Sequence, residues 1–137
     1  MQKTIEYFEL ESFKKDFKKL QKRFPTLPDD FARAKKDAIE LFHLSKINNQ
    51  SVVLIPGFPY EKFKIYKLRK FACKSLKGKG IYSGIRIIYA YDQENKTVTF
   101  IEIYFKSDQL NEDRNRIESF IGSLIIQSNT KFNGEKV

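Results

Sequence analysis

The sequence has one cysteine, one histidine and no tryptophan among its 137 residues. Because Cys73 has no second cysteine to pair with, the chain cannot form an intramolecular disulfide, which argues against a disulfide-stabilised secreted scaffold and favours a reducing cytoplasm. Cys73 and His43 alone cannot supply the ligand cluster of a zinc or iron site, and neither a GxGxxG motif nor a P-loop is present. We therefore expect no metal and no cofactor.

Long apolar runs are also missing, so the sequence predicts no membrane span, and its first residues lack the apolar core of a signal peptide. These absences predict a cytoplasmic protein with no membrane partner. The content of 41% hydrophobic and 15% aromatic residues suffices for a buried core. We expect a single domain over residues 1–127, followed by a polar, disordered tail at 128–137.

Acidic residues are absent from residues 62–91, which carry nine of the 26 basic residues. The nine are Lys62, Lys64, Lys67, Arg69, Lys70, Lys74, Lys77, Lys79 and Arg86. Without them the chain has 17 basic and 17 acidic residues, so this segment accounts for the whole net charge of +9. Because concentrated charge of one sign repels itself, we expect the segment to face a polyanion, a membrane surface or an acidic partner. Apolar and aromatic residues lie between these basic residues, which indicates that the segment belongs to a folded sheet. The sequence therefore favours a basic site of defined shape.

Along the chain, stretches with the hydrophobic spacing of strands and of helices follow one another in an order that predicts an α+β fold. A strand at 4–10 precedes a helix capped by Ser12, which Pro25 ends, and a second helix over residues 28–44 then forms an antiparallel hairpin with the first. Three antiparallel strands at 62–75, 83–91 and 97–105 complete a mostly antiparallel, twisted sheet. The final helix is predicted to be capped by Ser107 and Asp108.

Alternation of side chains along the last two strands assigns their faces. Ile85, Ile87, Tyr89 and Tyr91 share one face, and Arg86, Ile88 and Ala90 share the other. In the next strand Ile101, Ile103 and Phe105 are predicted on one face, with Val98, Phe100, Glu102 and Tyr104 on the other. If helices cover the isoleucine-rich face, the face with Arg86, Glu102 and Tyr104 is left open.

Three segments resemble the RelE/ParE toxin superfamily of bacterial type II toxin–antitoxin modules, and RelE-like members in particular. They are Tyr66–Phe71, Gly84–Tyr91 and Phe100–Asp108. With the order of elements, the resemblance covers nearly the whole chain except its tail. It implies a RelE-like domain that is a toxin of the mRNA interferase kind, a metal-independent endoribonuclease that inhibits translation by cutting mRNA on the ribosome. The implied partners are a cognate antitoxin, the ribosome and mRNA.

The resemblance also implies which residues act. The sheet arginine of the family corresponds to Arg86, the basic residues of the preceding strand to Lys67 and Arg69, and the end of the last strand to Tyr104 and Lys106. Some members have a histidine near the end of that strand and a tyrosine in the final helix, and this chain has neither.

The chemistry of RNA cleavage fits these residue types. Attack by a 2′-hydroxyl needs a base, positive charge on the phosphate and an acid for the leaving oxygen. Arg86 suits the phosphate, Glu102 or a lysine of lowered pKa could be the base, and Tyr104 could stack on an RNA base. Four further lysines are predicted to contact RNA phosphates, namely Lys70, Lys74, Lys77 and Lys79.

Two other functions stay open, because one fold hosts several activities. The first is a ParE-like inhibitor that binds DNA gyrase without catalysis, and the second is a non-toxic domain that binds RNA or the ribosome. At the residue level, Arg86 could form only a structural ion pair with Glu102. His43 is interpreted as a helix-end residue and Cys73 as a small buried hydrophobe.

Overall fold

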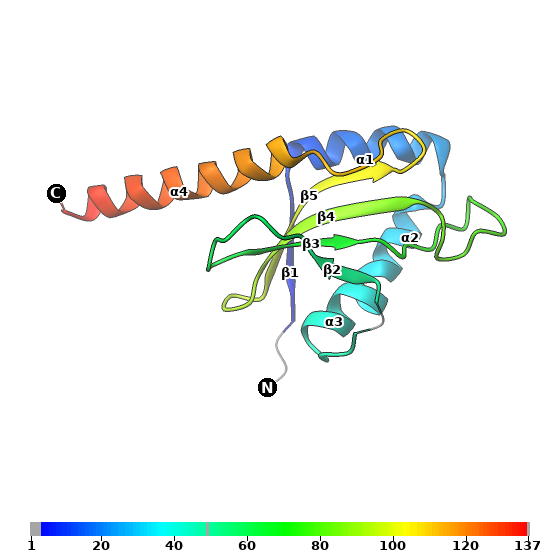
Figure 1. The fold of residues 1–137 in the computed structure, drawn as a ribbon, viewed down its shortest axis with the longest axis horizontal. Helices are drawn as coiled ribbons and strands as arrows, with labels where there is room; N and C mark the ends of the chain where they lie inside the picture. Colours follow the sequence, from blue (N-terminus) through cyan, green and yellow to red (C-terminus); the bar gives the residue numbers. More distant parts are fainter. Residues whose placement is uncertain (1–3, 49, 137) are drawn as a thin grey trace.

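The computed structural model describes residues 4–48 and 50–136, with side chains described up to residue 126. Its elements confirm the predicted α+β class: helices pack on a five-stranded sheet (Figure 1). The strands are β1 (Glu6–Glu9), β2 (Val52–Leu54), β3 (Lys64–Leu68), β4 (Ile85–Asp92) and β5 (Thr97–Phe105). The helices are α1 (Glu11–Arg23), α2 (Leu27–Ala34), η1 (Lys35–Glu40), α3 (Leu41–His43) and α4 (Arg114–Lys136).

The sheet has the order β1-β5-β4-β3-β2 and is mixed. β3, β4 and β5 pair antiparallel as predicted, whereas β1 pairs parallel with β5. The strand predicted over residues 62–75 is too long, because β3 ends at Leu68 and the chain leaves the sheet there. β2 is an additional strand at the edge of the sheet, in a short apolar run that was not among the predicted strands. Pro56 follows β2 closely and limits its length, since proline cannot donate to a strand ladder.

The first helix begins two residues earlier than predicted, at Glu11. Leu10 precedes α1 in extended conformation without a side-chain cap, so the assignment of Ser12 as the N-cap is wrong. α2, η1 and α3 follow one another without a break to His43, which confirms the predicted second helix. Figure 1 shows this helix descending obliquely from the end of α1, so the pair is not the simple antiparallel hairpin that the short link suggested.

Each face of the sheet is covered. On one face Phe13 of α1 and Phe31 of α2 pack with Ile87 and Tyr89 of β4 in the larger buried cluster. On the other face Ile117 and Phe120 of α4 pack with strand residues in a smaller cluster. The predicted open face is therefore wrong. The start of α4 and the segment before it lie over the face that was expected to be free.

A β-bulge in β5 changes the predicted faces. Ile88 pairs with Glu102, but the next residue, Tyr89, pairs with Phe100, so the register shifts by one at Ile101. As a result Val98 and Phe100 lie in the same cluster as Ile103 and Phe105, and not opposite them. After the bulge Glu102 and Tyr104 still share the face of Arg86.

The last helix starts later and ends later than the sequence indicated. Residues 106–113 form turns and a loop, and Asp113 accepts a hydrogen bond from the backbone N–H of Asn115, at 3.0 Å, as an N-cap does. Ser107 and Asp108 are therefore not the cap. α4 continues past Gln127 to Lys136 and projects beyond the sheet (Figure 1). The boundary of the domain at residue 127 stays a prediction.

Candidate functional site

Strand register places the main predicted site residues in two neighbouring rows on the face that α4 covers. In one row Lys67 of β3 pairs with Ile88 of β4, which pairs with Glu102 of β5. In the next row Arg86 of β4 pairs with Tyr104 of β5. Because alternate residues share a face, the pleat brings these side chains to one side of the sheet. The predicted grouping of Arg86, Glu102 and Tyr104 is confirmed.

Arg86 is half-buried, and its guanidinium donates a hydrogen bond to the backbone carbonyl of Arg69. It does not form the ion pair with Glu102 that the sequence left open, as far as the described residues extend. Arg69 is exposed, and its Nε donates to the carbonyl of Gln50 at 3.3 Å. The planar fork of Arg86 therefore has one N–H fixed by the protein and further donors available for an anion.

Tyr104 is nearly buried, with 5% of its surface exposed. Burial raises the pKa of its hydroxyl to about 12, the carboxylates of Glu112 and Glu102 add to the rise, and Arg86 partly opposes it. At neutral pH the Tyr104 hydroxyl is therefore protonated. It can donate a hydrogen bond or a proton but is poorly suited to accept one, and its burial contradicts a role in open stacking on RNA.

Glu102 is 2% exposed and its carboxylate is fully engaged at both oxygens. One oxygen accepts from Gln109 Nε2 at 2.7 Å and the other from the backbone N–H of Asp113 at 2.9 Å. These bonds tie the segment before α4 to the sheet. Glu102 therefore serves as an anchor in this structure, and it could act as a base only after the segment has moved.

Lys67 is paired with a residue that the sequence did not bring to the site. Its Nζ lies 2.6 Å from Glu112 Oε1, with both side chains mostly buried. Burial raises the pKa of Glu112, but the hydrogen bond and charge of Lys67 outweigh this effect, with help from Arg114 and the Glu112 backbone, so the net pKa is lowered. Glu112 is therefore a carboxylate at neutral pH, and Lys67, which contacts it, is not free to bind a phosphate.

The other predicted basic residues lie outside this group. Lys106 is exposed and follows Tyr104 on the same face, with its backbone N–H bonded to the carbonyl of Gly84 at 2.8 Å. Lys70 borders a small hollow next to Arg33. Lys74, Lys77 and Lys79 are exposed on the long connection between β3 and β4.

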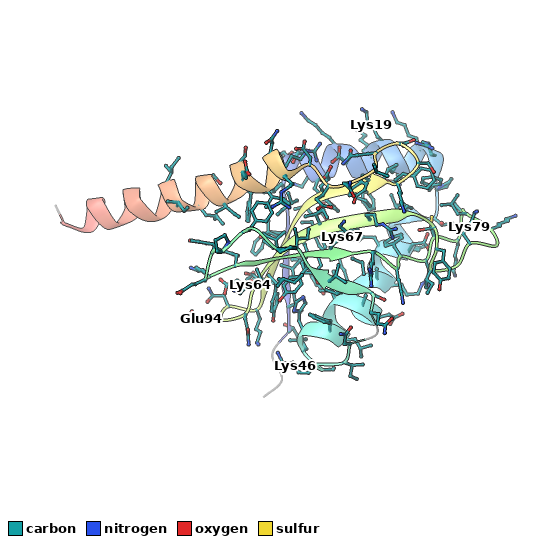
Figure 2. The ribbon with its side chains drawn as sticks, viewed as in Figure 1. Lys19, Lys46, Lys64, Lys67, Lys79 and Glu94 are labelled. Atoms are coloured by element: carbon teal, nitrogen blue, oxygen red, sulfur yellow. The ribbon has the colours of Figure 1, made fainter. Side chains whose placement is uncertain are left out.

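The acid-free segment is not a single patch. Figure 2 shows Lys64 and Lys79 toward opposite ends of the sheet, with Lys67 between them. Its charges are spread along β3 and the following connection, and Lys67 is already neutralised. Of the predicted basic residues, Arg86 pairs with Tyr104 across the strands, and Lys106 follows Tyr104 two positions later in the chain.

A hollow of about 430 Å³ lies between α1 and the end of β5. Its lining includes Tyr104 and Gln109 from the site and Lys19 and Arg23 from α1. Arg23 is held by Asp108, with 2.5 Å between Nη1 and Oδ2. The hollow lies beside the site on the α1 side, and its two basic residues come from α1.

Sequence reasoning missed Gln109, Glu112 and the loop position of Asp113. It placed these residues in the first turn of the last helix, where acidic side chains are favoured by the helix dipole. The available signal was Asp113 itself, because Asp is a preferred N-cap and would have shifted the helix start toward Arg114. That shift leaves Glu112 in a loop directly after a strand of the site.

No protein-family model and no curated protein matches the chain. Among solved structures, the chain is similar to one in the crystal structure of the archaeal RelE-RelB complex from Pyrococcus horikoshii OT3, with a TM-score of 0.45 and 12% identity. The match covers 76% of this chain and 97% of the other. Within the described residues no group of His, Cys, Asp or Glu is arranged to hold a metal ion. No described helix combines the length and hydropathy of a bilayer crossing.

Proposed function

We propose that this protein is the toxin of a type II toxin–antitoxin module and that it inhibits translation by cutting ribosome-bound mRNA. The observation that carries the proposal is the pairing of Arg86 with Tyr104 on neighbouring strands, next to exposed Lys106. An arginine fork stabilises the charge of a phosphate in its transition state, and a protonated tyrosine can donate to the leaving oxygen. Further support comes from the three sequence segments that resemble the RelE/ParE superfamily, Tyr66–Phe71, Gly84–Tyr91 and Phe100–Asp108.

The same arrangement limits how catalysis would proceed. We infer that the base is either Glu102 or Lys67. Both are engaged, Glu102 by two hydrogen bonds and Lys67 by its ion pair with Glu112, so cleavage by 2′-hydroxyl attack requires the segment 107–113 to release one of them. We propose that binding to the ribosome and mRNA supplies this change, and that the cognate antitoxin prevents it.

A second function is favoured by the same engaged groups. If segment 107–113 never releases Glu102 or Lys67, the basic face, meaning the face of the sheet that carries Arg86 and Lys67, has no general base. The protein can then only bind its target. That outcome corresponds to a ParE-like inhibitor of DNA gyrase.

Expression in bacteria separates the two functions. Expression of the chain should arrest growth and stop incorporation of labelled amino acids, with cleaved mRNA visible by primer extension. Arg86→Ala should lower cleavage at least about 100-fold, the cost of removing one transition-state donor. Arg86→Lys should recover little, since it keeps the charge but loses the fork.

Lys18→Ala is the matched control, because Lys18 is an exposed cation on α1 that does not line the hollow beside Tyr104. It should arrest growth as the wild type does, and circular dichroism should show that all variants fold. Blocked DNA replication with intact mRNA would instead establish the gyrase function. Harmless expression of the folded wild type would contradict both.

A further inference from the structure

The connection between β3 and β4 carries an exposed aromatic side chain among lysines. Tyr82 is 74% exposed and its neighbour Ile81 is 41% exposed. Lys74, Lys77 and Lys79 are exposed on the same connection, and Figure 2 shows Lys79 at its outer end, directed away from the sheet. No acidic residue occurs between residues 62 and 91. A ring this exposed gains little from packing within the protein, so its surroundings point to a partner.

The base of this connection is fixed to the start of α2. Asp30, which is 2% exposed, accepts from the backbone N–H of Lys74 at 3.1 Å and from Thr26 Oγ1 at 2.7 Å. Thr26 and Ser75 exchange backbone-to-hydroxyl hydrogen bonds in both directions, at 3.0 and 2.9 Å. On the other side Ser83 donates to the carbonyl of Phe71 at 2.5 Å. Both ends of the connection are therefore held.

The tip is built from successive turns. Backbone hydrogen bonds join Leu76 to Cys73, Lys79 to Leu76 and Tyr82 to Lys79, at 3.0, 3.2 and 2.9 Å. Gly78 and Gly80 adopt positive φ angles of 80° and 56°, which favour glycine. Tyr82 also forms a bridge with Phe71 through its backbone. These contacts hold the backbone of Tyr82 in a defined place, which lowers the entropic cost of ordering the segment on binding.

We propose that residues 76–82 form a second contact for single-stranded RNA, in which the Tyr82 ring stacks on an unpaired base while Lys77 and Lys79 bind the flanking phosphates. Exposed bases stack on aromatic side chains, and lysines add salt-dependent affinity for the backbone. Duplex RNA hides its base faces, so the ring favours single strands. This inference rests on RNA being the ligand of the proposed function, but it concerns a surface separate from Arg86 and Tyr104.

The test measures binding without cleavage. A fluorescent 2′-O-methyl oligonucleotide lacks the attacking hydroxyl, so anisotropy reports affinity whether or not the protein is an enzyme. Tyr82→Ala should weaken binding of the single strand about tenfold, the size expected for one lost stack, with an unchanged slope of affinity against salt. Tyr82→Phe should bind as the wild type does. Lys77→Ala and Lys79→Ala should each reduce the salt slope by about one.

Phe8→Ala is the matched control, since Phe8 is also a half-exposed aromatic (49%) but lies on β1 between two glutamates. It should leave the affinity unchanged. The proposal is overturned if Tyr82→Ala binds as tightly as the wild type, if duplex RNA binds as well as the single strand, or if the wild type binds neither. If the wild type does not cut RNA but Tyr82→Ala still weakens its binding, the result would contradict the proposed function and leave this proposal standing.

Discussion

Tyr89 and Tyr91 lie on the same strand and the same face, but their hydroxyl groups have different surroundings. The Tyr89 hydroxyl is 2.8 Å from His43 Nε2 in the buried core. The Tyr91 ring stacks on His43 with 3.9 Å between centroids, and within the described residues its buried hydroxyl has no hydrogen-bond partner. Neighbouring tyrosines thus make opposite polar contributions, although both contribute apolar packing.

These surroundings predict opposite effects of one substitution. Tyr91→Phe removes an unpaired buried hydroxyl and should leave the stability unchanged or raise it by about 1 kcal/mol. Tyr89→Phe leaves His43 without its partner and should lower the stability by about 1–2 kcal/mol. Urea unfolding of the two variants measures both changes, and each serves as the other's control. Equal effects would contradict the difference in hydrogen bonding.

Individual site residues were predictable where residue type and spacing suffice. Arg86 and Tyr104 were assigned to one face, and both lie there. Glu112 was not predicted, because its role depends on contact with Lys67, which is 45 positions away in the sequence. Cys73 is buried as expected. His43 lies at the end of α3 as predicted, but it is also buried and shares a hydrogen bond with the Tyr89 hydroxyl, which the sequence did not indicate.

At the scale of elements, segment 107–113 decides how open the site is. Glu112 neutralises Lys67, and Gln109 and Asp113 bond to Glu102. The Glu112 carboxylate thus occupies Lys67. Under the proposed function, segment 107–113 would compete with an RNA phosphate for Lys67, and weakening the segment should help RNA to bind.

Glu112→Gln tests this competition. It removes the negative charge beside Lys67 with little change in shape, so affinity for a 2′-O-methyl RNA should rise several-fold and the salt slope should increase by about one. Glu94→Gln is the control, because it changes the net charge equally from the exposed turn between β4 and β5, which Figure 2 labels. Equal gains from both variants would indicate a general charge effect, and contradict the competition.

The bulge in β5 is the element-scale feature that sequence could not supply. Period two holds on each side of Ile101, but the shift moves Val98 and Phe100 to the larger cluster. Both alternatives bury similar apolar residues, so hydrophobic alternation does not distinguish them. The register of β5 is fixed by its neighbours in the sheet. β5 pairs with β1 at Val98 to Phe100 and with β4 along its whole length.

At the scale of the whole molecule, stability should depend on pH through His43. Burial lowers the pKa of His43 from 6.5 to about 3, and the charges of Lys46 and Lys96 add to the effect. Below pH 6.5 the unfolded chain binds a proton at this residue that the folded chain excludes. The free energy of unfolding should therefore fall as the pH drops from 6.5 toward 3, by up to about 1.4 kcal/mol per pH unit.

Comparison with His43→Gln isolates this contribution from that of the carboxylates. Glutamine can still hydrogen-bond Tyr89 but does not titrate, so the difference in stability between wild type and variant should shrink as the pH is lowered. Urea unfolding between pH 4 and 7.5 at constant ionic strength gives the measurement. A difference that is constant across this range would show that the pKa of His43 is the same in the folded and unfolded chains, and would contradict the prediction.

The sequence by itself determined the α+β class, the antiparallel core strands β3 to β5, the helical stretches up to His43 and the common face of Arg86, Glu102 and Tyr104. These follow from local periods, prolines and net charge, which act between near neighbours. Only the tertiary structure decided the parallel pairing of β1, the edge strand β2, the bulge at Ile101 and the closure of the basic face by Glu112. Each of these depends on contacts between distant segments, whose geometry no local pattern encodes.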